Sequence, residues 1–205
     1  MTVSIFDIID IVDIKVQDKK LQNCNFYYNK TKYNLVNLTN ENLNDVYSFF
    51  KKFNDLEKNF FPYPLFKPID LSFDYFKKKF SEYTKEKSWV YFLLYNNNSL
   101  IGVTLLKKIG FLNTDSTEYK SPTSGIYISK ESRGKKIGLM LQKFVTFQAK
   151  LLNLDSIFIR VSSQNLGSQK IYDKCGFKKT GNVYSVIKDS FEWTDEEYVL
   201  DLQNN

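Results

Sequence analysis

The segment from Val161 to Phe177 reads VSSQNLGSQKIYDKCGF, and it sets the local order of the chain around it. The β-branched run Ser156–Val161, which leads into it, predicts a strand. Residues 166–174 predict a short helix that ends at Gly176, because glycine readily adopts the left-handed conformation that closes a helix. This part of the chain is therefore expected to run strand, loop and helix in close succession.

A second stretch lies upstream and reads SRGKKIG from Ser132 to Gly138. It stands between a predicted strand, Gly125–Ser129, and a long predicted helix. The apolar face of that helix is formed by Ile137, Met140, Leu141, Phe144, Gln148, Leu151 and Leu152. Backbone N–H groups at a glycine turn and a helix N-terminus attract anions. Alone, the stretch indicates either a phosphate or pyrophosphate site or a glycine turn with solvated lysines.

Taken together, the two stretches resemble the GNAT superfamily of acyl-CoA-dependent N-acyltransferases. The first GNAT motif is [RQ]-x-x-G-x-[GA] at a strand-to-helix turn. The second is a strand followed by N-x-x-[AS]-x-x-x-Y-x-x-x-G-F. The residues that match the second motif are Asn165, Ser168, Tyr172, Gly176 and Phe177. The first motif departs at one place, because Lys136 stands where its first glycine belongs.

The resemblance implies an α+β (mixed α/β) GNAT fold. Its central, mostly antiparallel twisted sheet of about six to seven strands is splayed between the fourth and fifth strands and flanked by about four helices. A hairpin is predicted over Asn25–Tyr28 and Tyr33–Leu38, and Thr39 is expected to cap the next helix. We assign residues 1–30 to an N-terminal extension of unknown role and residues 31–205 to the acyltransferase domain.

The resemblance also implies that acetyl-CoA, as co-substrate, lies in the cleft between the splayed strands. Its pyrophosphate is expected on the glycine turn and its pantetheine arm along the edge of the fourth strand. A backbone N–H near Ile128 is expected to polarise the thioester carbonyl. Asn165 is expected to bond the pantetheine or to orient its loop. The expected cofactor-binding residues are Ile126, Ile128, Arg133, Gly134, Lys135, Lys136, Ile137, Gly138, Asn165 and Ser168.

Two residues are expected to act in catalysis. Tyr172 can protonate or stabilise the leaving thiolate, whose parent thiol has a pKa of about 8.5, or its ring can simply pack the helix on the sheet. Glu118 precedes the fourth strand, a usual place for the base that takes the proton of the amine; the alternative is a solvated loop residue. Glu57 is a second candidate carboxylate.

Aromatic residues indicate where the acceptor binds. Phe60, Phe61 and Tyr63 are expected to border the acceptor pocket, and a hydrophobic cluster under a loop is the alternative. The run Phe191–Tyr198 is both acidic and aromatic. It can attract a cationic acceptor, or it can be a charged turn.

Composition excludes several classes of protein. The chain has 205 residues, 42% of them hydrophobic, with a net charge of +6, and it contains no histidine, so a His-based triad and a His-ligated metal are excluded. Its two cysteines, Cys24 and Cys175, do not make a disulfide scaffold. No apolar run approaches the length of a bilayer span, and no signal peptide is recognisable. We therefore expect a cytoplasmic protein that uses no metal.

The expected function is direct transfer of the acetyl group of acetyl-CoA to a primary amine within a ternary complex. A small-molecule amine such as an aminosugar is favoured as the acceptor. The alternatives are a protein N-terminus or lysine, a polyamine, or a non-catalytic CoA-binding regulatory domain. No nucleic-acid or membrane partner is expected, and the protein is expected to be a monomer or homodimer.

Overall fold

The computed structural model of the chain describes residues 8–54, 57, 72–85, 89–107, 122–188 and 191–203. Its strands are β1 (Asp10–Gln17), β2 (Lys20–Tyr28), β3 (Thr31–Asn37), β4 (Trp89–Asn96), β5 (Ser99–Lys107), β6 (Thr123–Ile128), β7 (Ser156–Ser162), β8 (Lys178–Lys188) and β9 (Phe191–Asp201). Its helices are α1 (Leu43–Lys51), α3 (Phe73–Lys85), α4 (Ile137–Leu151) and α5 (Leu166–Lys174), with a 3₁₀ turn, η3, at Lys130–Ser132. From β3 onward, the order of strands and α-helices is the predicted one.

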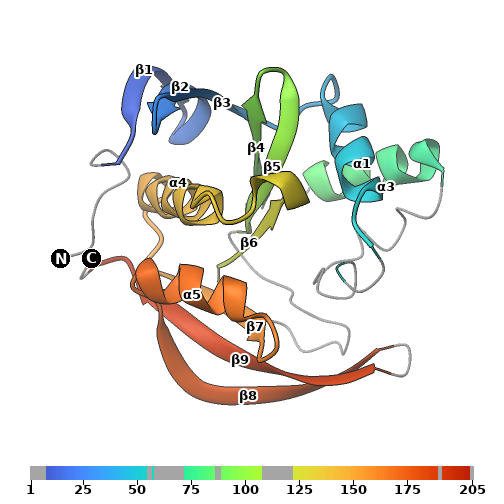
Figure 1. The fold of residues 1–205 in the computed structure, drawn as a ribbon, viewed down its shortest axis with the longest axis vertical. Helices are drawn as coiled ribbons and strands as arrows, with labels where there is room; N and C mark the ends of the chain where they lie inside the picture. The colour runs from blue at the N-terminus through green and yellow to red at the C-terminus, as the bar shows by residue number, and fades with distance from the viewer. Residues whose placement is uncertain are drawn as a thin grey trace.

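One large sheet organises the molecule (Figure 1). The described strands form a nine-stranded sheet in the order β1-β2-β3-β4-β5-β6-β7-β9-β8. Neighbouring strands are antiparallel except β6 and β7, which are parallel. The mixed α/β architecture agrees with the prediction, but the strand count exceeds the six to seven expected, because β1 and β2 extend the sheet beyond the seven strands that follow residue 30.

The β1–β2 hairpin is attached to the rest of the fold through β2. Residues of β2 pair with β3 from Asn23 opposite Val36 to Tyr28 opposite Thr31. Leu21, Cys24 and Phe26 are fully buried in the same cluster as α4. The segment assigned above to an extension thus supplies sheet and core, and residue 30 falls inside the β2–β3 turn.

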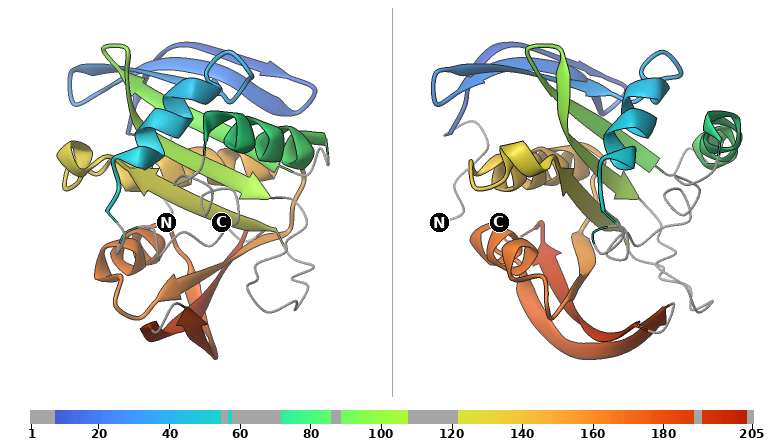
Figure 2. Two further views of the ribbon diagram at one scale, coloured as in Figure 1. Left: turned by 90° about the vertical axis from the view of Figure 1, so that its right-hand side faces the viewer. Right: turned by 45° about the vertical axis from the view of Figure 1, so that its right-hand side comes forward.

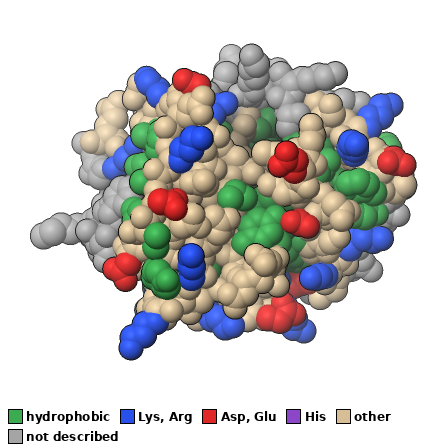
Figure 3. Space-filling model, turned by 90° about the horizontal axis from the view of Figure 1, so that it is seen from above, with side chains coloured by type: hydrophobic (Ala, Val, Ile, Leu, Met, Phe, Trp, Pro, Cys, Tyr) green, Lys and Arg blue, Asp and Glu red, His purple; other side chains and the backbone are tan. Residues whose placement is uncertain are grey.

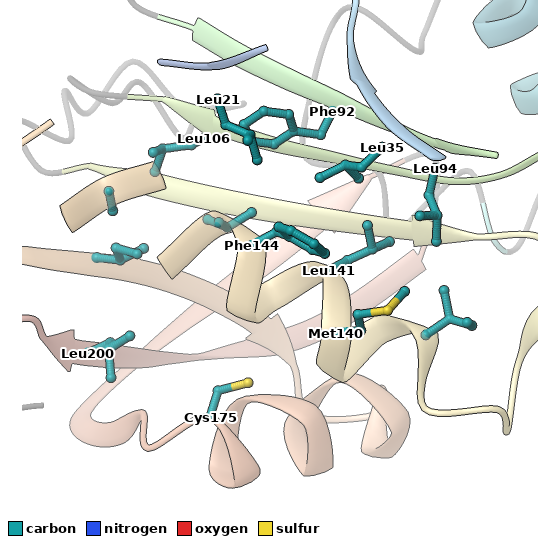
Figure 4. Packing of buried hydrophobic residues seen from close by; sticks show 14 of the residues in the cluster. Leu21, Leu35, Phe92, Leu94, Leu106, Met140, Leu141, Phe144, Cys175 and Leu200 are labelled. Atoms are coloured by element: carbon teal, nitrogen blue, oxygen red, sulfur yellow. The ribbon is translucent and has the colours of Figure 1, made fainter. Parts of the chain in front are cut away.

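Helices cover both faces of the sheet (Figure 2). We call them the α4 face, on which α4 and α5 lie, and the α1 face, on which α1 and α3 lie. On the α4 face, Leu141 and Phe144 of α4 pack into one buried cluster with strand residues such as Phe92 (Figure 4). On the α1 face, Val46 and Phe50 of α1 pack with Phe76 of α3 in a second cluster. Burial of these apolar stripes at helical spacing holds the layers together.

The start of α1 differs from the prediction. The helix begins at Leu43, so Asn42 and not Thr39 occupies the capping position. The Asn42 side chain accepts a hydrogen bond from the Thr39 N–H at 2.8 Å and donates to the Asn37 carbonyl at 3.0 Å. Asn42 therefore organises the turn that links β3 to α1, which a Ser/Thr-based capping rule does not reveal.

Gln148 of α4 joins the N-terminal hairpin to the core. Its fully buried side chain accepts a hydrogen bond from the Leu21 N–H at 2.8 Å and donates to the Lys19 carbonyl at 2.9 Å. We expect Gln148→Met to lower the free energy of unfolding by about 1–3 kcal/mol, since it leaves a buried N–H without a partner. Urea unfolding of the variant checks this. The exposed Gln164→Met is the control, and an equal, small change in both variants would contradict the expectation.

Candidate active site

The site begins where β6 and β7 part. These parallel strands pair only at Thr123 opposite Phe158, next to a 2.8 Å hydrogen bond from the Phe158 N–H to the Pro122 carbonyl. Beyond that point each strand continues, β6 to Ile128 and β7 to Ser162, without a further paired residue between them. The expected splay between the fourth and fifth strands of the domain corresponds to this opening.

The polar backbone groups that face the splay follow from the strand register. The Ser129 N–H donates to the Ile101 carbonyl of the neighbouring chain segment at 2.9 Å, while the Pro122 carbonyl accepts from β7. Because backbone groups alternate in direction along a strand, odd-numbered residues of β6 bond to β5 and even-numbered ones point toward β7. The N–H and C=O groups of Ile126 and the N–H of Ile128 therefore face the splay, where an extended ligand can pair with them as an added strand.

A tight turn brings the start of α4 to the end of β6. Gly134 and Lys136 have φ values of 76° and 62°, and the first turn of α4 follows at once. The first N–H groups of a helix have no partner within the helix, and they carry the positive end of its dipole. Gly134, Lys135 and Lys136 are exposed. The turn thus combines backbone donors with two solvated ammonium groups.

Lys136 occupies a conformation that suits glycine. The left-handed region costs a residue with a Cβ about 1–2 kcal/mol, and glycine pays no such penalty. The left-handed backbone at Lys136 thus explains why the GNAT motif has glycine at this position. Lysine is tolerated here because its side chain extends into solvent.

Gly138 leaves room for two side chains that pack against the start of α4. A Cβ at this position would lie 2.5 Å from Cδ1 of Ile171 in α5 and 2.9 Å from Cδ1 of Ile128 in β6. Both distances are shorter than real Cβ contacts allow. The glycine therefore leaves space for these two side-chain ends between α4, β6 and α5, and a larger residue would have to displace them.

Arg133 binds the last carbonyl of β6. Its Nε and Nη2 both donate to the Ile128 carbonyl at 3.3 Å, and its Nη1 lies 2.6 Å from Oε1 of Glu57. Desolvation raises the pKa of Glu57, but the Asn54 N–H and Arg133 outweigh it, so the pKa lies below its ordinary value. Glu57 is consequently an ionised partner of Arg133, and a lowered pKa makes it a weak proton acceptor.

The α5 residues of the second motif take two different positions. Asn165 is the N-cap of α5, with its side-chain oxygen accepting from the Ser168 N–H at 3.1 Å. Tyr172 is buried, and its ring lies 5.3 Å from that of Phe177, centroid to centroid. Burial raises the pKa of the Tyr172 phenol above its ordinary value, so it stays protonated and able to donate a hydrogen bond.

A polar cluster built partly from the acidic and aromatic run Phe191–Tyr198 lies beyond the splay on the α1 face. Glu197 of β9 stands opposite Arg160 of β7, two residues past Phe158, and is 4% exposed. Its carboxylate accepts hydrogen bonds from Thr180 at 2.9 Å, Asn182 at 2.8 Å and Tyr184 at 3.1 Å. Desolvation raises its pKa.

Two further groups complete this cluster. The Arg160 guanidinium carbon lies 3.3 Å from the centroid of the Tyr184 ring. Asp195 accepts from the Trp193 indole at 2.8 Å, and desolvation raises its pKa despite that bond and the nearby Arg160. The alternation of Trp193, Asp195 and Glu197 places all three on one face of β9. The spacing of two residues between Trp193, Asp195 and Glu197 is the sequence signal that indicates a shared face.

Four of the expected site residues, Glu118, Phe60, Phe61 and Tyr63, lie outside the described residues. Of the others, Ile126 and Ile128 lie on the edge of β6, the residues from Arg133 to Gly138 form the turn into α4, and Asn165 and Ser168 begin α5 after β7. Tyr172 lies further along α5, buried against Phe177. Among the described helices, none is long and apolar enough to cross a membrane.

Comparison with known families now identifies the class of protein. Residues 50–177 match the family model described as acetyltransferase (GNAT) family. This match covers more than half of the chain, and the chain belongs to that family. It is an acyl-CoA-dependent N-acetyltransferase. No curated protein matches the sequence.

Solved acetyltransferases share the fold. Spermidine N-acetyltransferase from Vibrio cholerae, in complex with CoA and spermine, is 20% identical with a TM-score of 0.65, and the match covers 83% of this chain and 96% of that one. An N-acetyltransferase from Staphylococcus aureus Mu50 is 19% identical with a TM-score of 0.64, covering 83% and 98%. A dodecameric structure of the Vibrio cholerae spermidine enzyme is 18% identical with a TM-score of 0.66, covering 84% and 95%.

Lys136→Gly tests the account of the turn. Relief of the left-handed strain outweighs the added flexibility of glycine in the unfolded chain, so we expect the free energy of unfolding to rise by up to about 1 kcal/mol. Thermal melting measures the change. Lys135→Gly is the matched control and is expected to be destabilised, because Lys135 has no positive φ to relieve. Equal losses in the two variants would contradict this account.

Proposed function

We propose that this chain transfers the acetyl group of acetyl-CoA directly to a small-molecule primary amine while both substrates are bound. The observation that carries the proposal is that β6 and β7 pair at one end only, so that backbone groups of Ile126 and Ile128 face the splay. The residues present fit acetyl-CoA. The edge of β6 suits the pantetheine amides, and the turn from Arg133 to Gly138 with the N-terminus of α4 suits the pyrophosphate.

In this proposal the chemistry is one displacement. The amine nitrogen attacks the thioester carbon, the C–S bond breaks, and the coenzyme leaves as a thiolate. The backbone N–H of Ile128 polarises the carbonyl oxygen. The Tyr172 phenol, kept protonated by burial, donates a hydrogen bond that stabilises the thiolate sulfur, and the thiolate then takes its proton from solvent.

The attacking amine has to lose a proton. An amine with a pKa near 10 is about one part in a thousand free base at pH 7, which corresponds to a penalty of about 4 kcal/mol. We propose Glu118 as the base and the aromatic residues Phe60, Phe61 and Tyr63 as a border of the acceptor pocket. The absence of a metal and the cytoplasmic location stay predictions.

We propose that the negative charge of Glu197 attracts the acceptor to its neighbourhood, while the carboxylate itself stays buried and bonded to three side chains. It lies on the α1 face, on the side of the sheet opposite α4 and α5, so an acceptor there approaches the thioester from the side not occupied by the coenzyme. A carboxylate with aromatic neighbours suits a cationic amine. An aminosugar is the acceptor class we favour. A polyamine is the second candidate, because the similar Vibrio cholerae structure is a spermidine N-acetyltransferase.

The variant Tyr172→Phe tests whether the Tyr172 hydroxyl acts on the leaving thiolate or whether the ring only packs α5 on the sheet. The variant keeps the ring that contacts Phe177, so the fold and acetyl-CoA binding are expected to persist. Loss of the hydroxyl is expected to lower kcat about 10²–10⁴-fold, measured by thiol release with a panel of aminosugars, polyamines and short peptides. The exposed Tyr75→Phe is the control. An unchanged kcat would assign Tyr172 to packing alone.

Glu197→Gln tests the acceptor site. The variant is expected to raise the KM for the amine at least about tenfold, while the rise in melting temperature caused by acetyl-CoA stays the same. Glu192→Gln, on the same strand but exposed, is the matched control. An unchanged amine KM would remove Glu197 from the acceptor site and leave the coenzyme site unaffected.

A further inference from the structure

The outer edge of the sheet is formed by β1 (Figure 1). All eight of its residues are exposed. They include Ile11, Val12, Ile14 and Val16, with exposed fractions of 36%, 55%, 38% and 43%. Seen from the side on which β1 to β3 lie, the surface shows hydrophobic side chains among charges of both signs (Figure 3). An apolar edge strand of this length is a template for pairing with another strand.

The two faces of β1 differ in character. Ile14 lies opposite the buried Cys24, which places its side chain on the α4 face. Asp13 and Lys15 therefore lie on the other face. There, Asn25 of β2 donates to both carboxylate oxygens of Asp13, at 3.1 and 2.9 Å. The charged groups at the centre of the edge are thus one acid and one base, two residues apart.

We propose that β1 pairs antiparallel with β1 of a second copy of this chain, about a twofold axis at Ile14. In this register, Asp13 of each chain lies opposite Lys15 of the other, so two opposite-charge pairs form. A shift by two residues in either direction would place Asp13 opposite Asp13, or Lys15 opposite Lys15. Opposite charges across a strand pair stabilise it and like charges destabilise it, so the sequence selects one register.

The pairing has a limited extent. The register between β1 and β2 shifts between Ile11 and Asp13 and again between Lys15 and Val16, so the regular part of β1 is Asp13–Lys15, the segment that carries both charged groups. In the proposed dimer, Ile14 lies opposite Ile14 of the second chain on the α4 face, next to Val16. Because a single strand edge buries little surface, the dimer is expected to be weak, with a dissociation constant in the micromolar range or above. This proposal is independent of the proposed catalytic function.

A charge exchange tests it directly. Asp13→Lys alone places lysine opposite lysine in the dimer, and Lys15→Asp alone places aspartate opposite aspartate. Each variant is expected to dimerise at least about tenfold more weakly than the parent in sedimentation velocity across a concentration series. An equimolar mixture of the two variants is expected to dimerise, because every charged pair is then complementary. The double variant D13K/K15D is expected to behave like the parent.

The control variants make the same kinds of charge change at positions outside the β1 edge. Glu41→Lys and Lys30→Asp are exposed and lie outside β1, and both are expected to dimerise like the parent. Circular dichroism and melting confirm that each variant folds. A parent that stays monomeric at the highest concentration would overturn the proposal. So would single variants that associate like the parent, or a mixture that associates no better than its components.

Discussion

The constraint on which the site depends is the limited pairing between β6 and β7. Parallel strands normally share an evenly spaced ladder of hydrogen bonds, but here the pairing is confined to Thr123 opposite Phe158. The remaining edge of β6 offers N–H and C=O groups that require partners. Every other pair of neighbouring strands in the described sheet shares several paired residues, so the splay stands apart, and the family's co-substrate chemistry fits it.

The surroundings of the splay keep its shape. Gly138 leaves room for the side chains of Ile128 and Ile171 at the start of α4, and the left-handed Lys136 turns the chain into the helix directly after η3. Arg133 binds the last carbonyl of β6 and links it to Glu57, beyond the end of α1. Backbone donors, a helix dipole and a pinned strand end are therefore held by packing, which favours binding without rearrangement.

Sequence reasoning succeeded where a motif carries a backbone requirement. The strand, turn and helix around Asn165 and Gly138 followed from residue type and spacing, as did the order of elements from β3 onward. It failed where tertiary contacts decide. Nothing local in residues 10–28 reveals that Gln148, more than a hundred residues away, anchors the turn between β1 and β2. The run that contains Glu197 was recognised as acidic, but the burial of Glu197 did not follow from it, because that burial depends on Thr180, Asn182 and Tyr184 of the neighbouring strand.

Amide hydrogen exchange along β6, with and without acetyl-CoA, tests the central claim most directly. If the coenzyme pairs with the open edge, the N–H groups of Ile126 and Ile128 gain protection of at least about tenfold, while that of Tyr127, already bonded to β5, changes little. Stabilisation of the protein by acetyl-CoA without added protection at Ile126 and Ile128 would contradict the account, because the coenzyme would then bind elsewhere than in the splay.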